Sequence, residues 1–93
     1  MPMADQETPP KRPLHKSDAL MRHENEYITI ITHGNNVFAT NHTGSYIWER
    51  LDGIYSIEEI VRDISATYQV DQSAANRRVR DFIQCLEDRG LLE

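Results

Sequence analysis

The side chains of this chain that could hold a metal ion or attack a substrate are few and scattered. They are four histidines, His15, His23, His33 and His42, and one cysteine, Cys85. No two of the histidines lie one helical turn apart and Cys85 is distant from all of them, whereas zinc ligands come in closely spaced sets. The cysteine also has no evident base beside it. The sequence therefore predicts no metal site, no catalytic residue and no cofactor.

Two pairs of neighbouring acidic residues, Glu58-Glu59 and Glu87-Asp88, also fail to suggest catalysis. Neighbours on a helix point about 100° apart, so the two carboxyl groups of a pair do not share a proton. Glu58 and Glu59 fall in the first turn of a predicted helix, where negative charge is favourable. Without a nucleophile, a metal set or a phosphate-binding loop, the sequence predicts a binding protein that is not an enzyme.

Arginines on the last predicted helix are the remaining charged residues that could recognise a ligand. Arg78 borders the apolar stripe of that helix, while Arg77 and Arg80 point outward. They are either solvated charge, with Arg77 and Asp81 paired one turn apart, or a positive wall for an acidic peptide or a phosphate backbone. The net charge of −5 disfavours nucleic acid, because phosphate contacts dominate such binding.

Three amphipathic helices are predicted between Asn41 and Leu92, each marked by residues typical of helix ends. The expected N-caps are Asn41, Ser56 (in a capping box with Glu59) and Asp71, and the expected terminators of the first and third helices are Gly53 and Gly90. The apolar stripes are Ile47, Trp48 and Leu51, then Ile57, Ile60, Val61, Ile64 and Tyr68, then Ala75, Val79, Phe82, Ile83 and Leu86. These stripes predict one shared core.

A β-hairpin is predicted ahead of the helices. Tyr27–Thr32 is rich in β-branched residues, the Gly and Asn residues at 33–36 supply the positive φ angles of a turn, and Val37–Thr40 returns. Ala19–Glu24 is a weaker candidate for a further strand. The order predicts a small α+β domain, winged-helix-like, in which an antiparallel sheet of two to three strands packs on three helices. No Lys or Pro blunts the strand Val37–Thr40, so its edge could accept an extended peptide.

The N-terminal segment has a different composition. All four prolines fall within the first thirteen residues, among polar and charged residues, so residues 1–16 are expected to form a flexible tail before a domain at 17–93. We find no signal peptide and no apolar stretch of the roughly 20 residues that a membrane span needs. A lone cysteine agrees with a reducing compartment, and the cytoplasm is the expected location.

The order of these motifs resembles the PqqD-like family, which includes the coenzyme PQQ synthesis protein D and recognition elements for ribosomally made, modified peptides. The segments that carry the resemblance are Asn41 to Gly53, Ser56 to Val61, Asp71, and the closing Leu86 to Leu92, and the match covers roughly residues 20–93. One departure is Thr40, which stands where the family usually has Leu before the Asn. The resemblance implies a three-stranded sheet packed on three helices.

It also implies a function without catalysis: holding the leader of a precursor peptide and presenting it to a modifying enzyme, often a radical S-adenosylmethionine protein. In similar proteins the leader adds a strand between the third strand and the third helix. Carried over by position, the peptide-binding residues are Val37, Phe38, Ala39 and Thr40 on the strand, and Arg78, Phe82 and Cys85 on the helix. Two alternatives stay open: a winged-helix DNA-binding regulator and a domain whose free edge forms homodimers.

Overall fold

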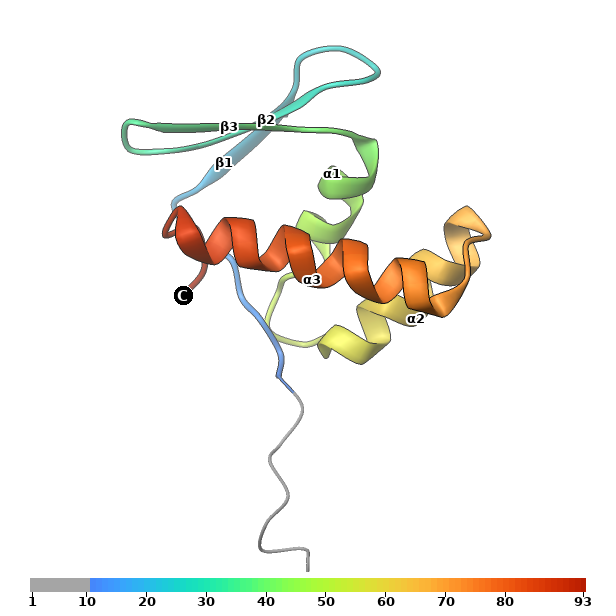
Figure 1. Ribbon diagram of the computed structural model, residues 1–93. Helices are drawn as coiled ribbons and strands as arrows, with labels where there is room; N and C mark the ends of the chain where they lie inside the picture. Colours follow the sequence, from blue (N-terminus) through green and yellow to red (C-terminus); the bar gives the residue numbers. More distant parts are fainter. Residues whose placement is uncertain (1–10) are drawn as a thin grey trace, which may run out of the picture.

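The computed structural model describes residues 11–93, which form a three-stranded sheet and three helices (Figure 1). The elements in chain order are β1 Leu20–His23, β2 Thr29–His33, β3 Asn36–Thr40, α1 His42–Glu49, α2 Ile57–Tyr68 and α3 Gln72–Asp88. The predicted α+β fold is confirmed, and its sheet has three strands. Among residues 11–93, none of the helices combines the length and the hydrophobicity that a membrane span requires.

The sheet is antiparallel in the order β1-β2-β3, so β1 and β3 are its two edge strands. Met21, Ile31 and Phe38 lie opposite one another across it and face the helices. The β2–β3 turn needs a positive φ angle at only one position, Gly34 at +58°. The expectation that Asn35 or Asn36 would share this conformation is wrong, since Gln69 is the only non-glycine residue with positive φ among those described.

The predicted helix starts are confirmed. Side chains of Asn41, Ser56 and Asp71 accept hydrogen bonds from backbone N–H groups three residues on, which satisfies donors that a helix leaves unpaired. Glu59 completes the capping box at Ser56. At the end of α3, the N–H of Gly90 (φ +70°) binds the carbonyl of Glu87, and the next N–H binds that of Leu86. This is a Schellman motif.

The predicted end of α1 is wrong. The helix ends at Glu49 with Arg50 as its C-cap, because the Arg50 N–H bonds back to the carbonyl of Ile47. Gly53 does have a positive φ of +80°, but it belongs to the turn that follows. Its N–H is engaged by the carbonyl of Pro13, a partner that lies far away in the sequence.

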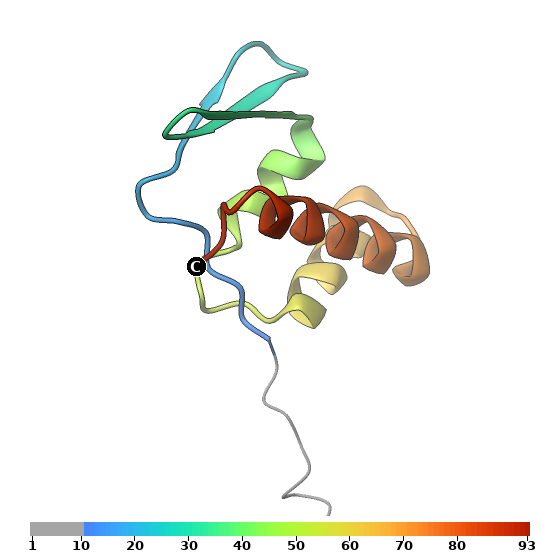
Figure 2. The same cartoon turned by 60° about the vertical axis from the view of Figure 1, so that its left-hand side comes forward.

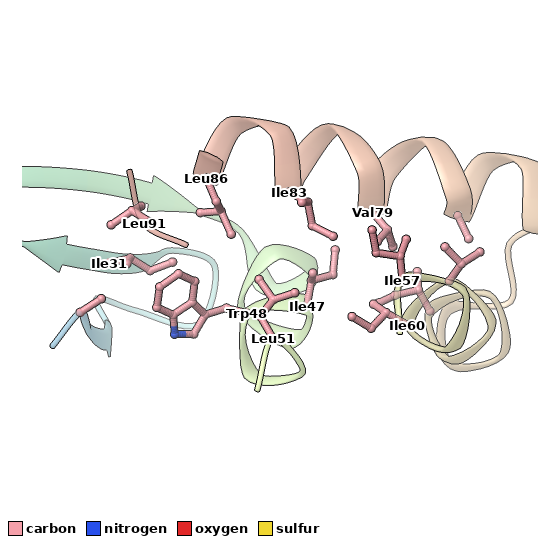
Figure 3. Close-up of a cluster of buried hydrophobic side chains, with 14 residues drawn as sticks. Ile31, Ile47, Trp48, Leu51, Ile57, Ile60, Val79, Ile83, Leu86 and Leu91 are labelled. Carbon is pink, nitrogen blue, oxygen red and sulfur yellow. The ribbon is translucent and has the colours of Figure 1, made fainter. Parts of the chain in front are cut away.

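The core lies where α1 meets the sheet on one side and α2 and α3 on the other (Figure 3). Side chains from all three helices and β2 converge there, and Ile31, Ile47, Leu51, Ile60, Ile64, Val79, Leu86 and Leu91 are fully buried. Because α3 packs on α2 with its N-terminal half and approaches the sheet with its C-terminal half, the apolar stripes share one core (Figure 3). The predicted stripes are therefore confirmed, with Phe82 and Tyr68 at the half-buried margin.

Residues 11–16, which the composition placed in a flexible tail, instead form an arm bound to the domain. The arm passes between the α1–α2 loop and the C-terminal segment (Figure 1). The backbone N–H groups of His15 and Lys16 donate hydrogen bonds to the carbonyls of Leu51 and Leu91, respectively. The carbonyl of Leu14 accepts a hydrogen bond from the backbone N–H of Glu93. The His15 ring also stacks on Trp48, with ring centroids 4.4 Å apart. The rest of the predicted tail, residues 1–10, lies outside the described residues.

Candidate functional site

The outer edge of β3 presents unpaired backbone groups within the part of the chain that the structure describes. The two-residue hairpin turn is closed by the pair His33 and Asn36, which is hydrogen-bonded in such a turn. Residues of an antiparallel ladder alternate between hydrogen-bonded and non-hydrogen-bonded pairs. Val37 and Ala39 therefore direct their N–H and C=O groups away from β2, toward the free edge. An extended chain could pair with both residues.

A groove lies beside this edge, between β3 and α3. The two elements are held apart by α1, which joins the end of β3 to the body of the domain in both views (Figures 1 and 2). We call this space the β3–α3 groove and define its sides by Phe38 and Thr40 on β3 and by Arg78 and Phe82 on α3. Phe38, Thr40 and Phe82 are half-buried and Arg78 is exposed. The groove is thus apolar at its base and charged at its rim.

One end of the β3–α3 groove is closed by aromatic contacts. The rings of Phe38 and Phe82 are 6.0 Å apart and tilted by 46°. The Arg89 guanidinium lies 4.7 Å from the centre of the Phe38 ring, within the range of a cation–π interaction. These three side chains join β3 to the C-terminal half of α3, so a ligand could not pass deeply between the two elements at this end.

The other end of the groove is open and forms a hollow of about 310 Å³. We call it the inner hollow; its lining residues are Thr40, Asn41, Thr43, Gly44, Ile47, Arg78, Asp81 and Phe82. Gly44 is essential to its shape, because a Cβ atom there would lie 2.0 Å from Thr40 Oγ1 and 3.0 Å from Phe82 Cε1. Because Gly44 has no side chain, the inner hollow has room for a side chain of a ligand.

Two arginines of α3, Arg78 and Arg80, make different contacts near the inner hollow. Arg80 bonds to Asn76 Oδ1 at 2.8 Å and pairs with Glu58 at 3.3 Å, so it ties α3 to α2. Arg78 lines the hollow and makes no ion pair with another described residue. Its guanidinium therefore remains available to a ligand. Because the Arg80–Glu58 pair is exposed, it disfavours a phosphate contact of Arg80 only weakly, and the winged-helix DNA interpretation is opposed mainly by the acidic net charge.

The position of α1, which carries Gly44 and Ile47, is set by a polar network on its other side. Arg50 Nε donates to Asp63 Oδ2 at 2.6 Å, and the Tyr46 hydroxyl donates to Asp63 Oδ1 at 3.1 Å. Burial is the largest single influence on both groups and disfavours their charged forms. The hydrogen bonds and charge interactions within the network together outweigh it, so the pKa of Asp63 is lowered and that of Arg50 is raised. The Arg50 guanidinium also lies 3.7 Å from the centre of the Tyr46 ring. The network fixes α1 against α2.

The structure brings together some of the predicted site residues and separates others. Thr40, Arg78 and Phe82 line one hollow, and Phe38 closes the groove beside it. Val37 and Ala39 are exposed, and their side chains alternate with Phe38 onto the outer face of the sheet, so they can contribute only through their backbone or on that face. Cys85 is exposed and does not line the inner hollow.

Sequence reasoning missed the residues that shape the hollow from α1 and from the end of α3. These are Asn41, Thr43, Gly44, Ile47, Asp81 and Arg89. Gly44 carried a signal that could have been used, since a glycine in the first turn of a helix, directly below a strand end, indicates close approach. No group of three or more His, Cys, Asp or Glu residues within 11–93 is arranged to hold a metal ion.

Comparisons with known proteins agree with this fold. The model of the family described as coenzyme PQQ synthesis protein D (PqqD) matches residues 20–92. The chain is also similar to a solved structure described as "TbiB1 in Complex with the TbiA(beta) Leader Peptide", with 30% sequence identity and a TM-score of 0.73. That similarity covers 86% of this chain and 94% of the other. A search of curated proteins gives no significant match.

Proposed function

The chain belongs to the coenzyme PQQ synthesis protein D (PqqD) family, and from this premise we propose that it is a non-catalytic peptide-binding adaptor. It holds the leader segment of a ribosomally made precursor peptide and presents that precursor to a modifying enzyme. The observation that carries the proposal is the free edge of β3 directly beside the inner hollow. The similar protein TbiB1, solved with a leader peptide, supports the same class of ligand.

The proposed binding mode is strand addition. The leader pairs with the backbone groups of Val37 and Ala39, and it places alternate side chains over the β3–α3 groove. One of these side chains enters the inner hollow beside Phe82, and an acidic side chain of the leader meets Arg78. Backbone pairing supplies affinity that is independent of sequence, and the hollow supplies selectivity.

The proposed partners follow from this role. The second partner is the enzyme that modifies the precursor, and we propose a radical S-adenosylmethionine protein, as the family resemblance implies. The adaptor itself contributes recognition and no chemistry. We propose a cytoplasmic location, because the precursor is met where ribosomes make it. A homodimer formed through the free edge of β3 would compete with the leader for the same backbone groups.

The test uses proline as a probe of the edge. A displayed library of random peptides is selected against the immobilised protein, and a selected peptide is synthesised with a fluorescent label for anisotropy. Ala39→Pro should weaken its binding at least tenfold, because proline removes an outward N–H and obstructs an added strand. Ala39→Ser is the matched control, since it keeps the N–H and a small side chain, and it should bind within about twofold of the parent.

Two outcomes of this experiment would contradict the proposal. If the library yields no binding peptide, or if the selected peptide binds Ala39→Pro and the parent equally well, strand addition at β3 is wrong. Urea unfolding of each variant checks that the sheet is intact, which is expected because edge strands tolerate proline where the N–H faces solvent. Backbone amide shifts in β3 and α3 on adding the peptide provide a second readout at the same site.

A further inference from the structure

A second hollow lies at the same end of β3, beside the β1–β2 loop. It has a volume of about 430 Å³ and is lined by Tyr27, Ile28, Ala39, Thr40 and Asn41. We call it the outer hollow. Ala39 alternates with Thr40 along β3, and it faces the side of the sheet that carries no helix. The outer hollow therefore opens on the face opposite to the inner hollow.

Two large apolar side chains are presented to solvent there. Tyr27 is 73% exposed and Ile28 is 42% exposed. The backbone N–H groups of both residues bond to Asn25 Oδ1, at 2.8 and 3.0 Å, and the Ile28 carbonyl accepts the N–H of Glu24 at 2.8 Å. The backbone of the loop is thus held by its own hydrogen bonds, and the loop presents the exposed ring and methyl groups beside Ala39 at the end of β3.

The inner and outer hollows meet at one point of the strand. Thr40 and Asn41 line both of them. Successive side chains of an extended chain point to opposite faces and are about 3.3 Å apart along the strand. A strand added along β3 that places one side chain in the inner hollow therefore directs a neighbouring side chain to the other face, toward Tyr27 and Ile28.

We propose that the outer hollow is a second specificity site for the leader, reading the residue adjacent to the one that enters the inner hollow. This inference rests on the proposed function and on binding along β3. The ligand chemistry follows from the lining: Tyr27, Ile28 and Ala39 offer an aromatic face and aliphatic groups without a charged side chain. The adjacent leader residue is therefore a large apolar or aromatic one. The leader is read as a pair of neighbouring residues, one on each face of the sheet.

The experiment couples a change in the protein to a change in the peptide. The probe is the peptide selected from the displayed library, together with copies in which each residue in turn is replaced by alanine. Tyr27→Ser should weaken binding of the unmodified peptide about fivefold to tenfold, because the apolar contact is lost. For one alanine copy, parent and Tyr27→Ser should bind equally, since that copy has already lost the contact. Tyr27→Phe should retain the parent affinity.

Leu20→Ser is the matched control on the protein. Leu20 is 69% exposed on the helix-free face, but it lies on β1 at the opposite edge of the sheet. Its replacement removes similar apolar surface and should change affinity less than twofold. Both residues are exposed, so neither variant should alter the urea midpoint greatly.

The outcomes separate this inference from the proposed function. Suppose that Ala39→Pro abolishes binding, but Tyr27→Ser lowers the affinity for every alanine copy by the same factor as for the unmodified peptide. The leader then adds to β3, and the outer hollow does not recognise any of its residues. If Ala39→Pro has no effect, the proposed function itself fails. If the parent is a dimer in sedimentation and Tyr27→Ser is a monomer, a second copy occupies the outer hollow and the inference is overturned.

Discussion

The ring of Phe38 on β3 lies 6.0 Å from the ring of Phe82 on α3, and this contact joins the sheet to the third helix across the groove. Arg89, just past the end of α3, adds to this junction by placing its guanidinium 4.7 Å from the centre of the Phe38 ring. The junction sets the separation of β3 and α3 at one end of the groove. At the other end the same separation leaves the inner hollow open beside Gly44.

The first prediction concerns this junction. Phe38→Leu and Phe82→Leu should each lower the free energy of unfolding, and their effects should not add. Aromatic pairs contribute about 0.5–1.5 kcal/mol beyond the area they bury, so a double-mutant cycle should give a coupling energy in that range. The measurement is urea unfolding of the parent, both single variants and the double variant. Additivity within about 0.3 kcal/mol would show that the two rings do not support each other.

The second prediction concerns Gly44. In most helices a glycine-to-alanine change stabilises by about 1 kcal/mol, but here the new methyl group would meet Thr40 and Phe82. We expect Gly44→Ala to lower the free energy of unfolding by about 1 kcal/mol, because overpacking costs about 1–3 kcal/mol. Adding Thr40→Ala should recover part of the loss by removing the nearest atom. If Gly44→Ala stabilises the protein, Thr40 and Phe82 do not lie as close to residue 44 as the prediction requires.

The third prediction concerns the N-terminal arm. A chain that starts at residue 17 should have a free energy of unfolding at least about 2 kcal/mol lower than that of a chain that starts at residue 11, as measured by urea unfolding. The reason is that it lacks the backbone hydrogen bonds to Leu51, Leu91 and Glu93. It also loses the ring that stacks on Trp48. Trp48 is the single tryptophan of the chain, so its emission should shift to longer wavelength in the shorter chain. If the two chains are equally stable, residues 11–16 do not stabilise the domain, and the original prediction of a tail holds for them.

The fourth prediction concerns the pH dependence of stability. The hydrogen bonds from Arg50 and Tyr46 hold the pKa of Asp63 below its ordinary value despite burial. A carboxyl with a lowered folded pKa stabilises the protein above its unfolded pKa, about 3.9, and this stabilisation disappears as the pH falls toward the folded pKa. Tm should therefore fall between about pH 5 and pH 3.

Asp63→Asn isolates this contribution. The variant should be less stable by about 1 kcal/mol at pH 7, since the pair is only partly buried. Its Tm should also depend less steeply on pH below 5 than that of the parent. Glu59 retains its lowered pKa through the capping bonds with Ser56, so some pH dependence remains in the variant. Parallel Tm profiles for the parent and Asp63→Asn would contradict the assignment to Asp63.

The parts of the fold that could be predicted from the sequence depend on neighbours within about one helical turn. Asn41, Ser56 and Asp71 cap helices through bonds to N–H groups three residues away, so each cap is visible in a short segment. The apolar periodicity likewise marks the buried face of each helix before its partner is known. The resemblance to the PqqD-like family, confirmed by the match to its model, rests on the order of these same local signals.

The candidate site was predicted only in part. Thr40, Arg78 and Phe82 were predicted and do line one hollow, whereas Gly44, Asp81 and the outer pair Tyr27 and Ile28 were not identified. These residues come from different elements, and nothing in a short segment shows that they meet. Their exposure and contacts depend on how far α3 and the β1–β2 loop stand from the end of β3.

The sequence by itself determined the element order, the helix starts, the buried stripes and the family. Only the tertiary structure decided that residues 11–16 are bound, that α1 ends before Gly53, and that the end of β3 has a hollow on each face. The physical reason is the distance along the sequence between the residues that interact. Caps and amphipathic stripes depend on interactions between residues close in sequence, whereas an edge, a groove and a bound arm depend on pairing and packing between segments that only folding brings together.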